Sequence, residues 1–128
     1  MTADEIITAA RAVIGVPFRH QGRSLSGLDC AGLIVHVARS FGLECIDGEA
    51  YSRHPSGGMH EATLDSQPCL VRVSEKQPGD VLLMRFAKDP QHLGIFTGDT
   101  LIHSYEKVGK VCEHRVDEAW ARRIVRVY

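Results

Sequence analysis

The chain has 128 residues, with 15 lysines and arginines against 16 aspartates and glutamates, and a sequence pI of about 6.6. This length predicts a single domain covering residues 1–128, and the balanced charge excludes a general attraction to nucleic acid or acidic lipid. The N-terminus lacks the pattern of a signal peptide, and no apolar run is long enough to span a bilayer. We therefore expect a protein made in the cytoplasm, with neither nucleic acid nor a membrane as its partner.

Two helices are predicted in the first third of the chain. Thr2 and Glu5 have the spacing of a capping box, and apolar residues then recur at helical spacing until Gly15. The stretch that follows is rich in glycine, serine and charge, which predicts a loop. A second helical pattern covers residues 30–41, with Asp29 as its N-cap.

The rest of the chain changes from helical patterns to strand patterns. Residues 44–67 are predicted to be mostly loop, with a short helix over residues 59–64. Short runs of β-forming residues then predict strands over residues 70–73, 80–86, 92–97, 100–105, 111–116 and 124–128. Helices early in the chain and strands late in it predict the α+β class with an antiparallel sheet.

Two of these strands carry histidines, and they are separated by Gly98-Asp99, a pair of residues typical of a tight hairpin turn. If these two residues form the turn, His92 lies opposite Tyr105. His92 and His103 then share one face of the sheet, because side chains alternate along a strand. A three-residue turn would place the two histidines on opposite faces, so the shared face depends on the hairpin register.

Cys30 stands where the glycine-rich loop gives way to the second helix. The N-terminus of a helix favours a thiolate over a thiol, so we expect this thiol to react with an alkylating probe before the other cysteines. If the helix packs on the histidine face, His92 is placed to take the thiol proton and return it to a leaving amine. His103 would orient the His92 ring, and the backbone N–H of Cys30 would donate to the oxyanion.

Each of these residues also has an ordinary structural interpretation. A cysteine is more often a small buried residue than a nucleophile, and a lone histidine on a strand is more often a hydrogen-bonded core residue. The four cysteines, at positions 30, 45, 69 and 112, contain no CxxC pair, so we expect no metal and no cofactor. Asp80 is expected to bond turn backbone, and Trp120 to anchor packing.

Four motifs follow one another in the order seen in the NlpC/P60 cysteine peptidases, and the chain resembles this family over nearly its whole length. The motifs are Asp29-Cys30-Ala31-Gly32-Leu33-Ile34, Pro78-Gly79-Asp80-Val81-Leu82-Leu83, His92-Leu93-Gly94-Ile95-Phe96-Thr97-Gly98 and Leu101-Ile102-His103. Residues 44–67 have no clear counterpart. The chain resembles the small, stand-alone form encoded with phage tails and phage-like gene-transfer particles more than it resembles the long secreted hydrolases.

The resemblance implies a papain-like α+β fold, a catalytic triad of Cys30, His92 and His103, and cleavage of cell-wall stem peptides, often between a D-glutamyl residue and a diamino acid. It also implies that the acid before the cysteine holds a substrate amine. The expected substrate-binding residues are Asp29, Phe18 and His20. Two positions depart from the family pattern, since Phe18 stands where tyrosine is common and Ala31 where serine is common.

The leading hypothesis is therefore a cysteine peptidase that hydrolyses peptidoglycan stem peptides through an acyl-enzyme on Cys30. Its expected partners are the stem peptide and the proteins of a phage tail or phage-like particle, which would deliver it to the cell wall or periplasm. Two alternatives stay open. One is an amidase or acyltransferase that uses the same thiolate, and the other is a structural tail-assembly protein whose site is secondary.

Overall fold

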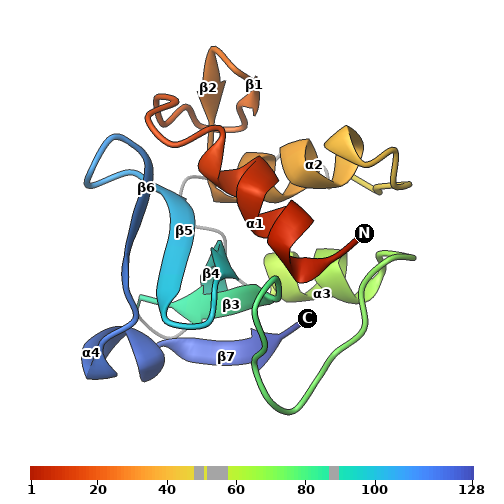
Figure 1. The fold of residues 1–128 in the computed structure, drawn as a ribbon, viewed down its shortest axis with the longest axis vertical. Helices are drawn as coiled ribbons and strands as arrows, with labels where there is room; N and C mark the ends of the chain where they lie inside the picture. Colours follow the sequence, from red (N-terminus) through yellow and green to blue (C-terminus); the bar gives the residue numbers. More distant parts are fainter. Residues whose placement is uncertain (48–50, 52–57, 87–89) are drawn as a thin grey trace.

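A computed structural model describes residues 1–47, 51, 58–86 and 90–128 of the chain. Its helices are α1 (Ala3–Arg11), α2 (Cys30–Ser40), α3 (Met59–Asp65) and α4 (Glu118–Ala121) (Figure 1). Its main strands are β3 (Val81–Arg85), β4 (Pro90–Phe96), β5 (Thr100–Tyr105), β6 (Lys110–Arg115) and β7 (Ile124–Val127). They form one antiparallel sheet in the order β6-β5-β4-β3-β7, which confirms the predicted α+β class.

The starts of the two helices predicted in the first third of the chain are confirmed by their side-chain caps. Glu5 donates its backbone N–H to the Thr2 hydroxyl, and the Glu5 carboxylate accepts from the Thr2 N–H, each over 3.2 Å. At the start of α2, the Asp29 carboxylate accepts from the Gly32 N–H over 2.7 Å. The second cap matters most for the site, because it fixes the position of Cys30 as the first residue of α2.

The hairpin between β4 and β5 has the predicted register. Ile95 pairs with Ile102 and Phe96 with Leu101, and the Thr97 N–H donates to the Thr100 carbonyl over 3.0 Å. Gly98 takes a positive φ of 119° at the turn, which a glycine adopts without strain. Continued along the strands, this register places the two histidines of the hairpin on one face of the sheet.

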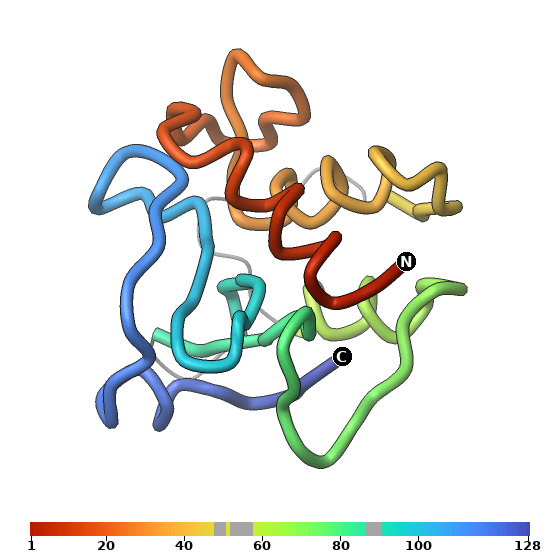
Figure 2. The backbone as a smooth tube through the Cα atoms, viewed as in Figure 1, coloured from red at the N-terminus to blue at the C-terminus, as the bar shows by residue number. Residues whose placement is uncertain are grey.

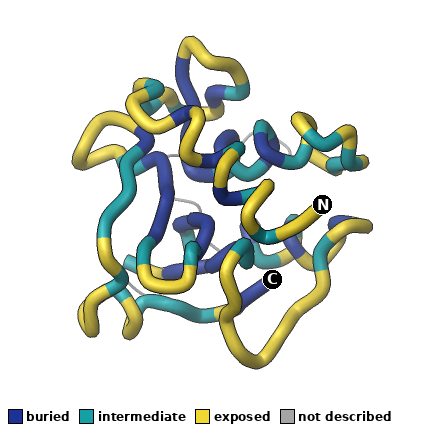
Figure 3. The backbone as a smooth tube through the Cα atoms, in the orientation of Figure 1, coloured by how far each residue is buried: buried dark blue, intermediate teal, exposed yellow. Residues whose placement is uncertain are grey.

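The two faces of the sheet are covered by different helices. One core cluster joins α1 and α2 to Ile95, Ile102 and Val111, and a neighbouring cluster joins Cys30 and the α3 residue Leu64 to the same face. The opposite face holds a third cluster, in which α4 packs through Trp120. Its buried members are Leu82, Met84, Phe96, Leu101 and Val127. Figure 3 shows the resulting burial along β5.

This arrangement corrects the expectation that α2 packs on the histidine face. Residues 92, 94 and 96 alternate with residues 93 and 95, and α2 packs on the face that carries Ile95. The histidines lie on the other face, which α4 covers. Cys30 comes near the histidines because it is the first residue of α2 and lines the same cleft as His92 of β4.

Two local predictions differ from the structure, and one helix was not predicted. The predicted strand at residues 70–73 is wrong: Val71 is 75% exposed, and only Val73 forms an isolated bridge, to Val127. Figure 2 shows this stretch as part of the long connection from α3 to β3. Within the predicted loop before Cys30, the strands β1 (Arg23–Ser24) and β2 (Gly27–Leu28) form a small hairpin. The single turn of α4 was not predicted.

Candidate active site

A cleft of about 580 Å³ opens where α2 and β4 both begin, and this volume suits a peptide-sized ligand. The sequence-predicted residues Phe18, His20, Asp29, Cys30 and His92 all line it. The other lining residues are Tyr51, His60, Phe86, Gln91, Ser104, Tyr105, Glu106, Lys107 and Arg123. The sixth predicted residue, His103, is fully buried behind His92.

Cys30 is held at the cleft by contacts on both sides of it in sequence. The Asp29 cap fixes the helix start, and the Ser104 hydroxyl donates to the Leu28 carbonyl over 2.5 Å, which ties the preceding loop to β5. The backbone of Leu93, the residue that follows His92 in β4, is close enough to Cys30 to lower the pKa of its thiol. The nucleophile candidate therefore lies beside the base candidate, with only 8% of its surface exposed.

Burial decides the resting state of this thiol. Desolvation, followed by the negative charge of Asp29, raises the pKa of Cys30 to about 12. Hydrogen bonds from the Leu93 and Ala31 backbone and the charge of Arg23 oppose this rise without cancelling it. The expectation of a thiolate made by the helix N-terminus is therefore wrong for the resting protein, because desolvation of a buried charge outweighs the helix dipole. Preferential alkylation of Cys30 near neutral pH is not expected either.

His92 and His103 are bonded through defined ring nitrogens. His92 Nε2 lies 2.5 Å from His103 Nδ1, so His92 Nδ1 is the nitrogen left for the thiol. Burial, followed by the neighbouring His103, lowers the pKa of His92 well below its usual value. Burial also lowers the pKa of His103 to about 3. Both imidazoles are thus neutral at physiological pH, and a neutral His92 is able to accept a proton.

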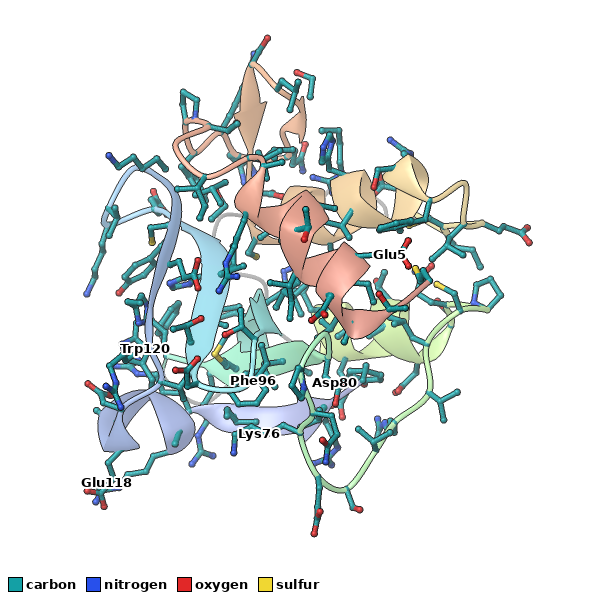
Figure 4. The ribbon with its side chains drawn as sticks, viewed as in Figure 1. Glu5, Lys76, Asp80, Phe96, Glu118 and Trp120 are labelled. Atoms are coloured by element: carbon teal, nitrogen blue, oxygen red, sulfur yellow. The ribbon has the colours of Figure 1, made fainter. Side chains whose placement is uncertain are left out.

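Aromatic rings pack around this histidine pair. His103 stacks on Tyr105 with ring centroids 5.1 Å apart, and Trp120 meets it edge-on at 5.2 Å. Phe86 covers His92 at 4.9 Å. Figure 4 shows Trp120 on the β6 side of α4, whereas Glu118 points outward from the same helix. The predicted packing role of Trp120 is confirmed, and one residue that it packs against, His103, belongs to the candidate site.

The Asp29 carboxylate is engaged by four protein donors. Oδ1 accepts from the Gly32 N–H and from Arg23 Nη1 over 2.9 Å, and Oδ2 accepts from the Gln21 N–H and the Tyr51 hydroxyl. Gln21 adopts a left-handed conformation with φ 58° to make its contact. Asp29 thus lines the cleft as predicted, but with its hydrogen-bonding capacity already used within the protein.

Sequence reasoning missed several residues of this site. Tyr51 lies in the segment that gave no readable pattern, and Arg23 lies in the stretch that predicted only a loop. His114 was not singled out by the sequence either, yet its Nε2 lies 2.8 Å from His103 Nε2. The alternation of His114 with Cys112, the partner of His103 across the hairpin, is the signal that would have found it.

Asp80 behaves as predicted, with its carboxylate accepting from the Gln77 N–H over 2.8 Å in the turn before β3. No group of three or more histidine, cysteine or acidic side chains suited to a metal ion occurs among the described residues. The arrangement of the site is that of nucleophilic acyl transfer, with a thiol, a neutral imidazole and a second imidazole behind it.

A family model for the NlpC/P60 family matches residues 15–128 of the chain. The chain belongs to the NlpC/P60 family. Among curated relatives, "Probable endopeptidase Rv2190c" of Mycobacterium tuberculosis is 34% identical over 100 residues, which cover 77% of this chain and 22% of that protein. The murein DD-endopeptidase MepS/murein LD-carboxypeptidase of Escherichia coli K12 is 26% identical over 111 residues, covering 85% of this chain and 53% of that protein. The NlpC/P60 chain thus spans at most about half of these relatives.

Solved structures show the same NlpC/P60 fold. An NlpC/P60 family protein from Bacillus cereus superposes with a TM-score of 0.75 at 20% identity, covering 99% of this chain and 39% of that one. RipD from Mycobacterium tuberculosis, described as a non-catalytic NlpC/p60 domain protein adapted to peptidoglycan binding, superposes with a TM-score of 0.66 at 18% identity, covering 98% and 93%. The fold therefore occurs in catalytic and in non-catalytic proteins, and the side chains of the cleft distinguish the two.

Proposed function

We propose that this protein is a cysteine peptidase that hydrolyses the stem peptides of bacterial peptidoglycan. The observation that carries the proposal is the meeting of Cys30 and His92 in one cleft, with His103 bonded to the far nitrogen of His92. The names of the curated relatives, which are endopeptidases, support the reaction class, and the murein endopeptidase of E. coli supports the substrate.

In the proposed reaction the Cys30 sulfur bonds to the scissile carbonyl carbon while His92 Nδ1 takes the thiol proton. As the first residue of α2, Cys30 has a backbone N–H outside the hydrogen bonds of the helix, and this N–H donates to the oxyanion. His92 next gives its proton to the leaving amine nitrogen, so the C–N bond breaks and a thioester remains. Water attacks the thioester as His92 takes one of its protons, and this proton returns to the departing sulfur.

Charges around the cleft suit the proposed substrate. Lys107 and Arg123 both line it and offer positive charge to the carboxylates of a stem peptide. An amine contact at Asp29, as the resemblance implies, requires one of its four donors to move, and Tyr51 is the donor that also lines the cleft. We propose cleavage between a D-glutamyl residue and a diamino acid, with the stem carboxylates recognised by these cations.

Digestion of purified peptidoglycan tests this function. Released fragments are identified by mass spectrometry, in water alone and with an added amine acceptor. The proposal expects fragments with a free D-glutamyl carboxylate under both conditions. Fragments that carry the added amine would instead indicate an acyltransferase. Co-sedimentation with peptidoglycan in the absence of any fragment would indicate a binding protein and overturn the proposal.

We also propose that the protein is made in the cytoplasm and reaches the cell wall on a phage tail or phage-like particle. The support is the resemblance to the small form encoded with such particles. Mass spectrometry of density-purified particles from the producing cells tests this delivery route. We expect the chain at a constant ratio to the tail proteins, and its absence from intact particles would contradict the proposal.

A further inference from the structure

The histidine pair is the beginning of a row of three imidazoles that ends on a backbone carbonyl. After the bond between His92 Nε2 and His103 Nδ1, His103 Nε2 lies 2.8 Å from His114 Nε2. His114 Nδ1 in turn lies 2.9 Å from the carbonyl oxygen of Arg115. The row therefore crosses β4, β5 and β6, and every bond in it joins identified atoms.

The sheet register explains how His114 comes to lie in this row. His103 pairs with Cys112 across the β5–β6 hairpin, and His114, two residues further along β6, is on the same face. Trp120 packs on both rings, with its centroid 5.2 Å from that of His103 and 4.8 Å from that of His114. The third imidazole is thus held by the strand and by α4 together.

The carbonyl at the end of the row fixes which nitrogens carry hydrogen. A carbonyl oxygen only accepts, so His114 Nδ1 must be the donor. In a neutral ring Nε2 of His114 is then an acceptor, and His103 Nε2 must carry the hydrogen. By the same reasoning His103 Nδ1 accepts, and His92 donates to it from Nε2. The remaining nitrogen, His92 Nδ1, has no hydrogen.

We propose that His114 is a positioning residue which, with the Arg115 carbonyl, holds His92 in the tautomer with a bare Nδ1 facing the thiol. The assignment of the tautomers stands on the hydrogen bonds of the three neutral rings, and its catalytic consequence rests on the proposed function. Cys30 is buried and its thiol is neutral at rest, so the base must have a free lone pair at the moment of attack. The opposite tautomer would point an N–H at the thiol and accept nothing.

No proton needs to travel along the row during the reaction. When His92 Nδ1 takes the thiol proton, His92 becomes a cation that still donates from Nε2 to His103. His103 and His114 keep their own hydrogens throughout. The row therefore acts by setting one tautomer before the substrate arrives, and it stabilises the imidazolium by the dipoles of the two neutral rings.

The wild-type protein provides the first test, by long-range ¹H–¹⁵N correlation of uniformly ¹⁵N-labelled protein near pH 7.5. We expect ring nitrogen shifts that show hydrogen on Nε2 of His92 and His103, and on Nδ1 of His114. Hydrogen on Nδ1 of His92 would overturn the proposal. This measurement needs no substrate, so its outcome is separate from the success or failure of the proposed peptidase activity.

Two substitutions at position 114 provide the second test. His114→Gln keeps a side-chain oxygen able to accept from His103, and we expect kcat to stay within about threefold of wild type. His114→Leu removes the acceptor, and we expect kcat to fall at least about tenfold, short of the ~10⁴-fold loss caused by a wholly wrong tautomer in a serine-protease triad. KM should be unchanged in both variants, because His114 is not among the described residues that line the cleft.

Spectra of the His114→Leu variant complete the test. We expect His92 signals that show a mixture of the two tautomers, with a thermal unfolding curve that remains cooperative. A folded His114→Leu variant with the wild-type kcat and the wild-type His92 tautomer would overturn the proposal. If this variant fails to fold, the wild-type spectrum and the His114→Gln variant still decide the question.

Discussion

At the scale of single residues, the Asp29 carboxylate joins the start of α2 to the loop before it and to Tyr51. The cap at Asp29 involves a residue three positions away, and helix-start patterns encode such contacts directly. Its other partners, Arg23 and Tyr51, come from a loop and from a segment without periodic pattern. The resting state of Cys30 was wrongly predicted for the same reason, since the helix rule is local and burial depends on the whole fold.

Asp29 should contribute far more to the free energy of unfolding than Asp47 does. Asp47 also pairs with Arg23, but its side chain is 30% exposed. An amide at position 29 presents an N–H₂ to groups that are themselves donors. We expect Asp29→Asn to lower the free energy of unfolding by about 3 kcal/mol. The matched Asp47→Asn should cost about 1 kcal/mol or less.

Urea denaturation of both variants at pH 7 checks these values. The carboxylate at position 29 has four donors within the protein, so its replacement leaves several of them unsatisfied, whereas solvent can serve the donors freed at position 47. Equal losses in the two variants would contradict the structural role assigned to Asp29.

The buried histidines should make the fold sensitive to acid. Burial on folding lowers the pKa of His103 to about 3 and that of His92 well below the ordinary value of about 6.5 for histidine. Below pH 6.5 the unfolded chain therefore binds protons that the folded chain does not. The free energy of unfolding accordingly decreases as the pH is lowered. Between pH 6.5 and pH 5, His103 should contribute a loss of about 1.6 kcal/mol, and His92 should add a loss of the same sign, both measured by urea denaturation.

His103→Asn isolates one of these contributions. With one proton-binding site removed from the unfolded chain, the loss of stability over the same pH interval should be about 1.6 kcal/mol smaller than in wild type. Identical losses in the two proteins would mean that His103 titrates in the folded state as it does in the unfolded chain.

At the scale of elements, strand composition located the five strands of the main sheet, and turn chemistry set the register between two of them. The Gly98-Asp99 turn set the β4–β5 register correctly, because a two-residue hairpin permits one pairing. The apolar run at residues 70–73 did not become a strand, since only Val73 finds a partner. The face on which α2 packs was also wrongly predicted, because it depends on how three layers fill the core and no single motif records it.

Gly32 lies in the first turn of α2. We expect its replacement by alanine to lower the stability of the protein, although alanine has the higher helix propensity. Replacement of a helical glycine by alanine ordinarily adds up to about 1 kcal/mol of stability. Here a Cβ would come within 2.0 Å of the Gly22 carbonyl oxygen, in the loop that leads to Arg23. We expect Gly32→Ala to lower the free energy of unfolding by about 1–3 kcal/mol and to reduce peptide release.

Thermal and urea unfolding of Gly32→Ala check the sign of this effect. A stabilised variant would show that the loop before α2 moves away from the helix at little cost. The close approach assigned here to Gly22 and Gly32 would then not hold the site together.

At the scale of the whole molecule, the cleft lies where the elements of both faces of the sheet come together. α2 brings Cys30 from the face that it shares with α1 and α3, and β4 brings His92 from the face covered by α4. The motif order predicted that these residues belong together. Their meeting in one cleft depends on how α2 packs against the sheet, which single motifs do not contain.

The most direct test of the account is the rate of stem-peptide release by Cys30→Ala, beside Cys69→Ala as a control at an exposed cysteine. Both variants should keep the wild-type unfolding midpoint within about 2 °C, since each change removes only a single sulfur atom. We predict that Cys30→Ala loses release by at least about 10³-fold, while Cys69→Ala keeps the wild-type rate. Release by a folded Cys30→Ala variant at a rate near that of wild type would contradict the account.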